Sequence, residues 1–129
     1  MMPWFSIDSV RYDMPCSIER TAEVRPSDIS GMLLDKKYFN DVLGTYLKYT
    51  ISIAIPAGQE NDYSQLYEIL TNPVASHTVN CPYNQTRKTI VGRIESVSDS
   101  YYREEDGIHI WRRTKFDIIS NEPYKVNSL

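Results

Sequence analysis

The sequence has few of the residues that build metal sites, disulfide scaffolds and phosphate-binding loops. Its 129 residues include two cysteines, two histidines and five glycines. Cys16 and Cys81 lack the close spacing of a zinc or redox motif, and two thiols are too few for a disulfide framework. The glycines are not clustered, which excludes the P-loop and dinucleotide-binding fingerprints. A chain of this length can form a core without such support, so we expect a single domain over residues 1–129.

Long apolar runs and a strong charge of one sign are also missing. No segment approaches the roughly 18 apolar residues of a membrane-spanning helix, and the N-terminus has no basic region followed by a hydrophobic stretch. We therefore expect a protein that is made and stays in a cytosol-like compartment, without a membrane partner. The formal net charge is −3. Because neutralising phosphates needs a basic face, general nucleic-acid binding is not expected.

Ten tyrosines are the strongest bias in the composition. Tyrosine suits half-buried strand faces and protein interfaces. The clearest strand signal covers Tyr46–Pro56, where every second residue from Leu47 to Ile55 is apolar or aromatic. Further strands are predicted over Trp4–Val10, Cys16–Arg25 and His77–Cys81, the last of them ended by Pro82. The segment Pro26–Gly44 shows no clear period and is predicted to be a long loop or an irregular strand.

One short helix is predicted over about residues 62–71. Asp62 is placed to cap it, Gln65 completes a capping box, and Asn72–Pro73 ends it. Its apolar side chains follow the i, i+3, i+4, i+7 pattern of a single face; they are Tyr63, Leu66, Tyr67 and Leu70. A helix this short does not persist alone in water, so we expect it to dock on a sheet.

The C-terminal third predicts a long hairpin over about residues 88–120. Two extended segments, Lys88–Ser100 and Ile108–Ser120, are separated by Glu104–Gly107, and Asp-Gly between alternating runs is a strong turn signal. A turn centred near Glu105 gives these pairs: Arg93 with Asp117, Glu95 with Lys115, and Ile94 with Phe116. That register joins opposite charges on one face and apolar groups on the other.

Together these elements predict a mostly β chain of the α+β type. The expected architecture is an antiparallel β-sandwich or half-barrel with one short amphipathic helix at about 62–71 and a long C-terminal hairpin at about 88–120.

No group of residues in the sequence predicts catalysis, and no catalytic, cofactor-binding or metal-binding residue is assigned. A zinc site would use His77 and Cys81, with Cys16 or His109 in support. However, four residues of extended strand span about 13 Å, too far for two ligands of one ion. Glu104–Asp106 lies at the predicted hairpin tip, where solvated turn residues are the usual finding. The GxSxG and HExxH motifs are absent, and we do not expect an enzyme.

One segment, Trp111–Lys115, resembles a nucleic-acid surface because it combines an aromatic ring with three basic residues. In a strand Arg113 and Lys115 point away from Arg112, so the run does not form a single basic patch. The alternative that it leaves open is a monomeric regulatory or nucleic-acid-binding module that uses the basic strand around Arg112. Asn84–Thr86 matches the glycosylation sequon, which carries little weight without a secretory signal.

Short strings between Arg20 and Lys125 carry a family resemblance. They are Gly44–Tyr46, Tyr49–Ile51, Leu66–Leu70 followed by Pro73, His77–Pro82, Phe116–Ile119 and Asn121–Pro123. In this order they resemble small tail-region proteins of siphophages and prophages of Gram-positive bacteria. The layout is also similar to the fold shared by tail-tube proteins and the N-terminal domain of distal tail proteins. One departure is that no long hydrophobic hairpin of the tube-subunit kind is evident, unless Lys88–Ser120 supplies it.

The resemblance implies a non-catalytic structural component of a phage or prophage tail, found in the virion tail and, during assembly, in the host cytoplasm. Its subunits are expected to assemble with themselves into a ring, commonly a hexamer, and with neighbouring tail proteins. No cofactor is implied, and the family has no catalytic residues to transfer. Head-to-tail contacts between subunits close into rings when the rotation permits.

Overall fold

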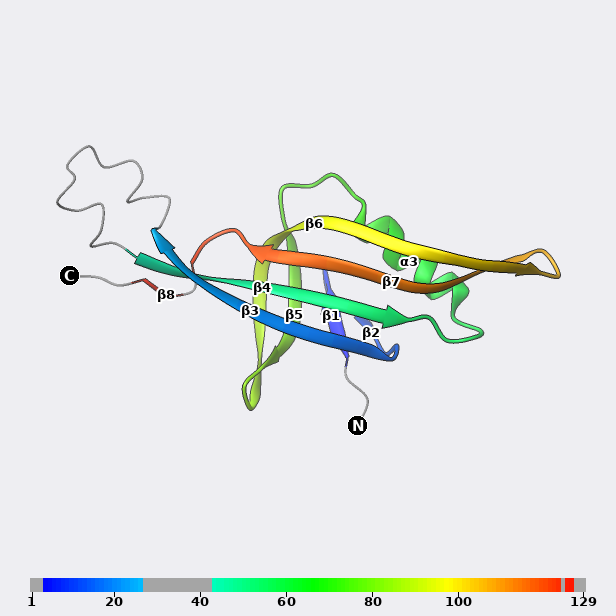
Figure 1. Cartoon of the computed structure of the whole chain (residues 1–129), viewed down its shortest axis with the longest axis horizontal. Helices are drawn as coiled ribbons and strands as arrows, with labels where there is room; N and C mark the ends of the chain where they lie inside the picture. Colours follow the sequence, from blue (N-terminus) through cyan, green and yellow to red (C-terminus); the bar gives the residue numbers. More distant parts are fainter. Residues whose placement is uncertain (1–3, 27–42, 124, 127–129) are drawn as a thin grey trace.

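The computed structural model describes residues 4–26, 43–123 and 125–126, and most of these residues lie in β-strands (Figure 1). The strands are β1 (Phe5–Ile7), β2 (Val10–Tyr12), β3 (Cys16–Pro26), β4 (Leu43–Ala54), β5 (His77–Tyr83), β6 (Thr86–Glu105), β7 (Ile108–Ser120) and β8 (Lys125–Val126). One helix of the described part, α3 (Glu60–Leu70), lies between β4 and β5 in the chain. No helix in the described ranges is long and apolar enough to cross a membrane.

The strands form one antiparallel sheet that is not closed into a barrel. Their order is β2-β1-β5-β6-β7-β4-β3, and β8 pairs with β4 outside this path. This architecture confirms the predicted mostly β fold with one short helix and a long C-terminal hairpin.

β6 is the strand that folds the sheet over on itself. Its first part, residues 86–92, pairs with β5, whereas its later part pairs with β7 alone among the described strands. In Figure 1 the first part runs steeply across the molecule and the later part turns to follow the long axis. The register shifts between Ile94 and Val97, directly after this change of direction, and such bulges bend and twist a strand. The result is a half-barrel in which β1 and β5 lie over β4 and β7.

The hydrophobic core lies between these two layers. The ring of Phe5 on β1 meets the ring of Phe116 on β7 edge to face, with 5.8 Å between the centroids. Tyr49 on β4 is buried, and its hydroxyl donates a hydrogen bond to the carbonyl of Pro82 on β5 at 2.9 Å. Both contacts join strands that are not neighbours in the sheet, so they hold the folded sheet in place.

Most strand predictions are confirmed, with shifted boundaries. The strand over Tyr46–Pro56 corresponds to β4, whose alternate residues from Leu47 to Ile53 are buried as predicted. β5 continues past Pro82 to Tyr83, because Pro82 and Tyr83 still pair with the start of β6. The prediction for Pro26–Gly44 falls mainly outside the described residues.

The single strand predicted over Trp4–Val10 is wrong. The segment instead forms the hairpin of β1 and β2, which turns at Asp8 and Ser9. Both residues have positive φ, 50° and 72°, and positive φ at both central positions is typical of a two-residue hairpin turn. Neither position is a glycine, which is why the turn is not evident in the sequence.

Helix α3 is confirmed, but its predicted capping box is wrong. The helix begins two residues earlier than expected, and its N-cap residue Gln59 makes no side-chain capping bond. Asp62 therefore lies inside the first turn, where its negative charge interacts favourably with the positive end of the helix dipole. Three residues of the predicted apolar face are buried, whereas Tyr67 is 37% exposed; the buried ones are Tyr63, Leu66 and Leu70. Their burial contributes roughly 1.5–3 kcal/mol each and anchors the helix.

The predicted hairpin register is also wrong. Lys115 pairs with Ser98 rather than with Glu95, and Ile94 pairs with Ile118 rather than with Phe116. The turn consists of the two residues Asp106 and Gly107, so the strands continue to the end of the hairpin. Each residue of β6 therefore pairs with a β7 residue two or three positions further along the chain than predicted. The charge pairing proposed from the sequence does not occur; Glu95 instead contacts Arg93, its near neighbour, at 3.4 Å.

Gly92 is predicted to be essential for the bend, because a Cβ atom there would overlap the backbone carbonyl of Ile119. We expect Gly92→Ala to lower the free energy of unfolding by about 3 kcal/mol or to prevent folding, measured by urea denaturation. Gly107→Ala is the matched control: its φ is +80° but nothing lies within 4 Å of the added atom, so a loss of about 1–2 kcal/mol is expected. Equal losses at the two positions would contradict the packing constraint.

Candidate functional site

The end of the β6–β7 hairpin projects beyond the rest of the sheet. We call residues 101–111 the hairpin arm. Its pairs are Tyr101–Trp111, Arg103–Ile110, Glu104–His109 and Glu105–Ile108. β4 ends at Ala54, and the last bond from this side joins the Ile55 amide to the Arg112 carbonyl at 3.2 Å. Within the described part of the chain, the arm is thus a ribbon of two strands with no third strand on either edge (Figure 1).

The arm carries large apolar side chains that solvent reaches. Tyr101, Tyr102 and Ile108 are 49%, 45% and 52% exposed. The ring of Tyr101 contacts the rings of Trp111 and His109, with 5.1 Å and 5.8 Å between centroids. These three residues therefore form a small aromatic cluster along the arm, of which only Trp111 also packs against the core.

Tyr102 belongs to a second cluster on the arm, in which it lies against two guanidinium groups. The Cζ of Arg112 is 3.8 Å from the centroid of the Tyr102 ring, and the Cζ of Arg103 is 5.0 Å from it. Arg103 also forms an ion pair with Glu105. The register shifts around Tyr101 and Arg103 are bulges. Because of them, the arm does not continue the side-chain alternation of the rest of the hairpin.

An open groove of about 700 Å³ lies at the base of the arm, on the face of the sheet that points away from the core. Arg113 and Lys115 line it, and both side chains are exposed because they alternate with the buried Thr114 and Phe116. Hydroxyl groups surround these two cations; they belong to Ser17, Ser52, Ser98 and Ser100. β6 and β7, whose ends form the arm, also line the groove, together with residues of β3 and β4.

Helix α3 is fixed to the base of the arm by a hydrogen bond. The Tyr63 hydroxyl donates to Oδ2 of Asp99 on β6 at 2.5 Å. Burial raises the pKa of Tyr63, and the Asp99 carboxylate raises it further, so the hydroxyl stays protonated and remains a donor. The helix therefore braces the hairpin up to Asp99, and the arm begins just beyond this brace.

The two histidines considered for a metal site lie in different surroundings. His77 is buried and its Nδ1 lies 2.7 Å from Oδ2 of Asp8, whereas the Nδ1 of His109 lies 2.9 Å from the Tyr101 hydroxyl on the arm. In the described ranges no group of three or more His, Cys, Asp or Glu residues is placed to hold a metal ion. Both imidazoles have structural neighbours, and neither geometry indicates a ligand set.

The two cysteines are thiols in this structure. Burial raises the pKa of Cys81 to about 12 and also raises that of Cys16. A thiol that stays protonated at neutral pH is a poor nucleophile and a poor metal ligand. Burial therefore disfavours the reactive thiolate form of both cysteines.

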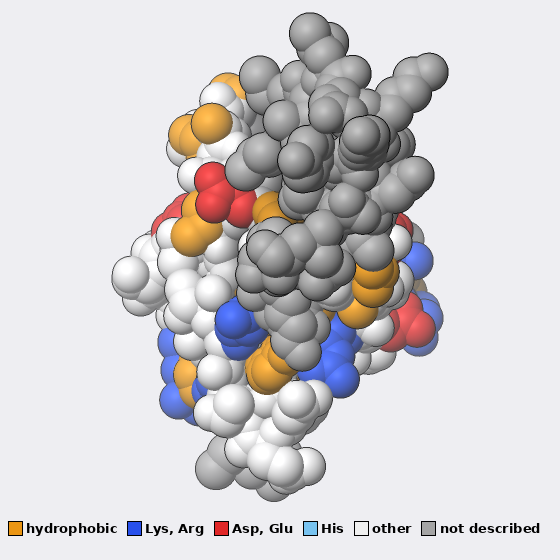
Figure 2. Space-filling view, turned by 90° about the vertical axis from the view of Figure 1, so that its left-hand side faces the viewer, with side chains coloured by type: hydrophobic (Ala, Val, Ile, Leu, Met, Phe, Trp, Pro, Cys, Tyr) orange, Lys and Arg blue, Asp and Glu red, His pale blue; other side chains and the backbone are white. Residues whose placement is uncertain are grey.

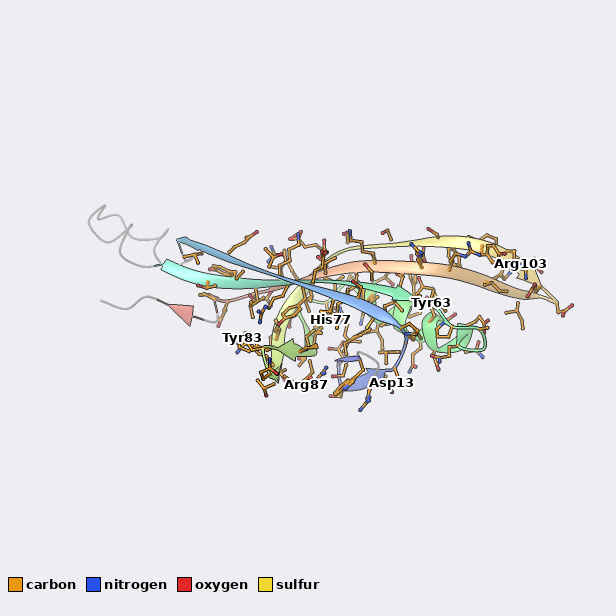
Figure 3. The ribbon with its side chains drawn as sticks, turned by 60° about the horizontal axis from the view of Figure 1, so that its bottom comes forward. Asp13, Tyr63, His77, Tyr83, Arg87 and Arg103 are labelled. Atoms are coloured by element: carbon orange, nitrogen blue, oxygen red, sulfur yellow. The ribbon has the colours of Figure 1, made fainter. Side chains whose placement is uncertain are left out.

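The basic residues do not form one surface. Trp111 packs partly into the core, Arg112 lies on Tyr102, and Arg113 and Lys115 line the groove. Arg87 lies far from Arg103, near Tyr83 in the lower part of the view in Figure 3. Figure 2 views the end opposite the arm, where basic, acidic and hydrophobic side chains are interspersed. Among the described residues visible in that view, the Lys and Arg side chains do not gather into one broad patch.

The Arg87 side chain makes its contacts within its own layer of the sheet. Its Cζ stacks on the Trp4 ring at 3.5 Å, and its Nε donates to Oδ1 of Asn80 at 2.5 Å. Arg11 stacks on the same Trp4 ring at 4.0 Å. These contacts fix the start of β1 to β5 and β6. Asn84, the residue of the sequon, lies in the β5–β6 turn and accepts a hydrogen bond from Arg20 at 2.9 Å.

The comparisons with protein-family models, with curated proteins and with solved structures find no match to this chain. The resemblance to phage tail proteins therefore remains a prediction from the sequence.

Sequence reasoning missed the exposed residues of the arm. Tyr101, Tyr102 and Ile108 flank the acidic turn in the sequence, and adjacent aromatic residues next to a solvated turn are the signal that points to them. The sequence does not show that β4 stops short of them.

The brace between α3 and the hairpin leads to a prediction about stability. We expect Tyr63→Phe to lower the free energy of unfolding by about 1–2 kcal/mol, because it leaves the half-buried Asp99 without its donor. Tyr12→Phe is the matched control, since Tyr12 is equally buried but its hydroxyl has no partner among the described residues. That change is expected to be neutral or slightly stabilising in the same urea titration. Equal losses in both variants would contradict the role of the bond.

The contact between Asp8 and His77 predicts a pH dependence. Partial burial raises the pKa of Asp8, but hydrogen bonds from the Thr78 amide and from His77, with the charge of His77, lower it by more. The net pKa is below its ordinary value, so this stabilisation is present above about pH 4 and lost as the pH falls through the lowered pKa.

Asp8→Asn keeps an acceptor for Thr78 and removes the charge. We expect it to be less stable than the original chain at pH 6 by no more than about 1 kcal/mol, because the carboxylate is 41% exposed. Thermal unfolding between pH 6 and pH 2.5 should show the two curves converging at the acid end. A difference that does not change with pH would contradict the account.

Proposed function

We propose that this chain is a non-catalytic assembly subunit and that its hairpin arm binds a partner subunit. The observation that carries the proposal is that the arm has no third strand among the described residues. An isolated two-stranded hairpin is only marginally stable in water, and three or more strands with a covered face are needed for independent stability. The arm nevertheless stays paired from Tyr101 to its turn, although with bulges, and exposes Tyr101, Tyr102 and Ile108. A partner surface that covers these side chains supplies what the arm lacks.

The chemistry of the arm is also that of a protein interface. Tyrosine, tryptophan and arginine are the residues that most often dominate binding energy, because they combine a large contact area with polar atoms. All three types occur in or beside the arm, as Tyr101, Tyr102, Trp111 and Arg112. Assembly is therefore the function that the composition of the arm favours.

For the biological setting we propose a phage or prophage tail, in which copies assemble with each other and with neighbouring tail proteins. The sequence strings support this setting, as does a mostly β chain with one short helix and a long hairpin. Examination of the gene neighbourhood tests it independently of the assembly itself. A tape-measure gene close by is the expected result, and a location among metabolic or regulatory genes would contradict the tail setting.

A monomeric nucleic-acid-binding module is the second candidate, because Arg112 and Arg103 flank Tyr102 as in a stacking platform. Three carboxylates, those of Glu104, Glu105 and Asp106, lie at the same end of the arm. They repel phosphates, and only Glu105 is neutralised by an ion pair among the described residues. Assembly through protein contacts therefore has the stronger support.

Removing the exposed side chains of the arm tests the proposal. We expect Tyr101→Ser, Tyr102→Ser and Ile108→Thr, combined in one variant, to weaken self-association at least about a hundredfold in sedimentation velocity, because they remove the apolar centre of the contact. The matched control is Val91→Thr with Val24→Thr, which changes two apolar residues outside the arm that are at least as exposed. That control should assemble like the original chain.

Each result of this experiment decides between the candidates. Loss of association in the arm variant alone supports the assembly role. A chain that sediments as a monomer at every concentration contradicts self-assembly, and salt-dependent retention of that monomer on DNA would favour the second candidate. Equal association of all variants would place the contact outside the arm and contradict the proposal.

A further inference from the structure

Four exposed charges near the arm have no partner among the described residues. Glu104 and Asp106 lie at its tip, and Arg113 and Lys115 lie in the groove at its base. Two pairs of neighbouring charges are already formed: Arg103 with Glu105 at the tip, and Lys48 with Asp117 on the outer face. The tip is therefore acidic and the groove is basic, with two unpaired charges on each.

We infer that the groove is the docking site for the arm tip of a second copy of this chain. The inference rests on the proposed function and specifies the surface that receives the arm. Glu104 and Asp106 of one copy would lie against Arg113 and Lys115 of the next. Opposite charges on complementary surfaces guide association and fix the register of a contact.

The form of the groove suits this occupant. It is open, has a volume of about 700 Å³, and is lined mainly by small side chains, so a narrow ribbon tip can enter it. Arg113 and Lys115 are two residues apart on the same strand face, which places them roughly 6–7 Å from each other. Serine hydroxyls beside them, such as those of Ser98 and Ser100, can donate further hydrogen bonds to carboxylates.

Asp99 also borders the groove but does not compete for these cations. Its Oδ2 accepts the hydrogen bond from Tyr63 on the side of the helix. Asp117, two residues beyond Lys115, accepts a hydrogen bond from Thr50 at 2.7 Å. Asp99 and Asp117 are thus engaged within the same copy and leave the cations available to a second copy.

A contact between the tip of one copy and the base of another joins two different surfaces. Such a heterologous contact repeats from copy to copy and forms a closed ring or an open filament. The acidic and basic surfaces lie on the same hairpin, so every copy can give one contact and receive one. Because the contact relies on exposed charges, it should weaken as salt is raised.

Charge reversal provides the test. The arm variant carries Glu104→Lys and Asp106→Asn, where asparagine keeps the turn because it tolerates the positive φ of 51° at this position. The groove variant carries Arg113→Glu and Lys115→Glu. All four positions are exposed, so both variants are expected to fold, which circular dichroism and thermal unfolding would verify. Glu122→Lys, an exposed charge reversal outside the arm and the groove, is the control.

We expect each variant alone to associate at least tenfold more weakly than the original chain in sedimentation equilibrium at low salt, with the control unchanged. An equimolar mixture of the two variants should regain assembly. In that mixture the acidic tip of the groove variant meets the basic groove of the arm variant. The basic tip of the arm variant in turn meets the acidic groove of the groove variant. The chain that carries all four changes should also assemble.

The outcomes separate this inference from the proposed function. Variants that associate as strongly as the original chain overturn the groove as the receiving surface, while loss of association in the aromatic arm variant would still support assembly through the arm. Weakening without recovery in the mixture overturns the head-to-tail pairing of these two surfaces. A chain that is a monomer under all conditions overturns both proposals.

Discussion

The bend of β6 at Gly92 is the constraint on which the rest of the structure depends. One strand of 20 residues serves two layers, and the change of direction is possible because no side chain stands between Gly92 and the carbonyl of Ile119. The bend brings Phe5 over Phe116 and Pro82 within reach of the Tyr49 hydroxyl. β5 pairs with β6 only up to the bend. The part of β6 beyond the bend, which includes the arm, therefore does not have β5 as a neighbour.

Much of the fold could be predicted from the sequence because it depends on local patterns. The alternation in β4, the apolar face of α3 and the Asp-Gly turn are each recorded in a few neighbouring residues. The register of the hairpin and the β1–β2 turn were predicted wrongly. The register depends on bulges, which insert residues that no period reveals, and the turn places Asp8 and Ser9 at positive φ without a glycine.

The candidate site could be predicted only in part. The sequence indicates a hairpin longer than the strand over Tyr46–Pro56, and this mismatch in length is the physical origin of the arm. Which residues remain uncovered depends on tertiary structure, because β4 ends beside Arg113 and the brace from Tyr63 ends at Asp99. The alternation of the strand predicts that Arg112 points away from Arg113 and Lys115, and the structure places Arg112 on Tyr102. The groove that Arg113 and Lys115 line could not be predicted, because other strands complete it.

The central claim is that the arm is incomplete until a partner subunit covers it. Hydrogen–deuterium exchange of the amides in residues 101–111, followed by mass spectrometry over a range of protein concentrations, tests this claim most directly. The account predicts that exchange in the arm slows markedly as the concentration rises, while the amides of residues 47–53 in β4 stay protected throughout. Protection of the arm that is the same at all concentrations, whether high or low, would contradict the account.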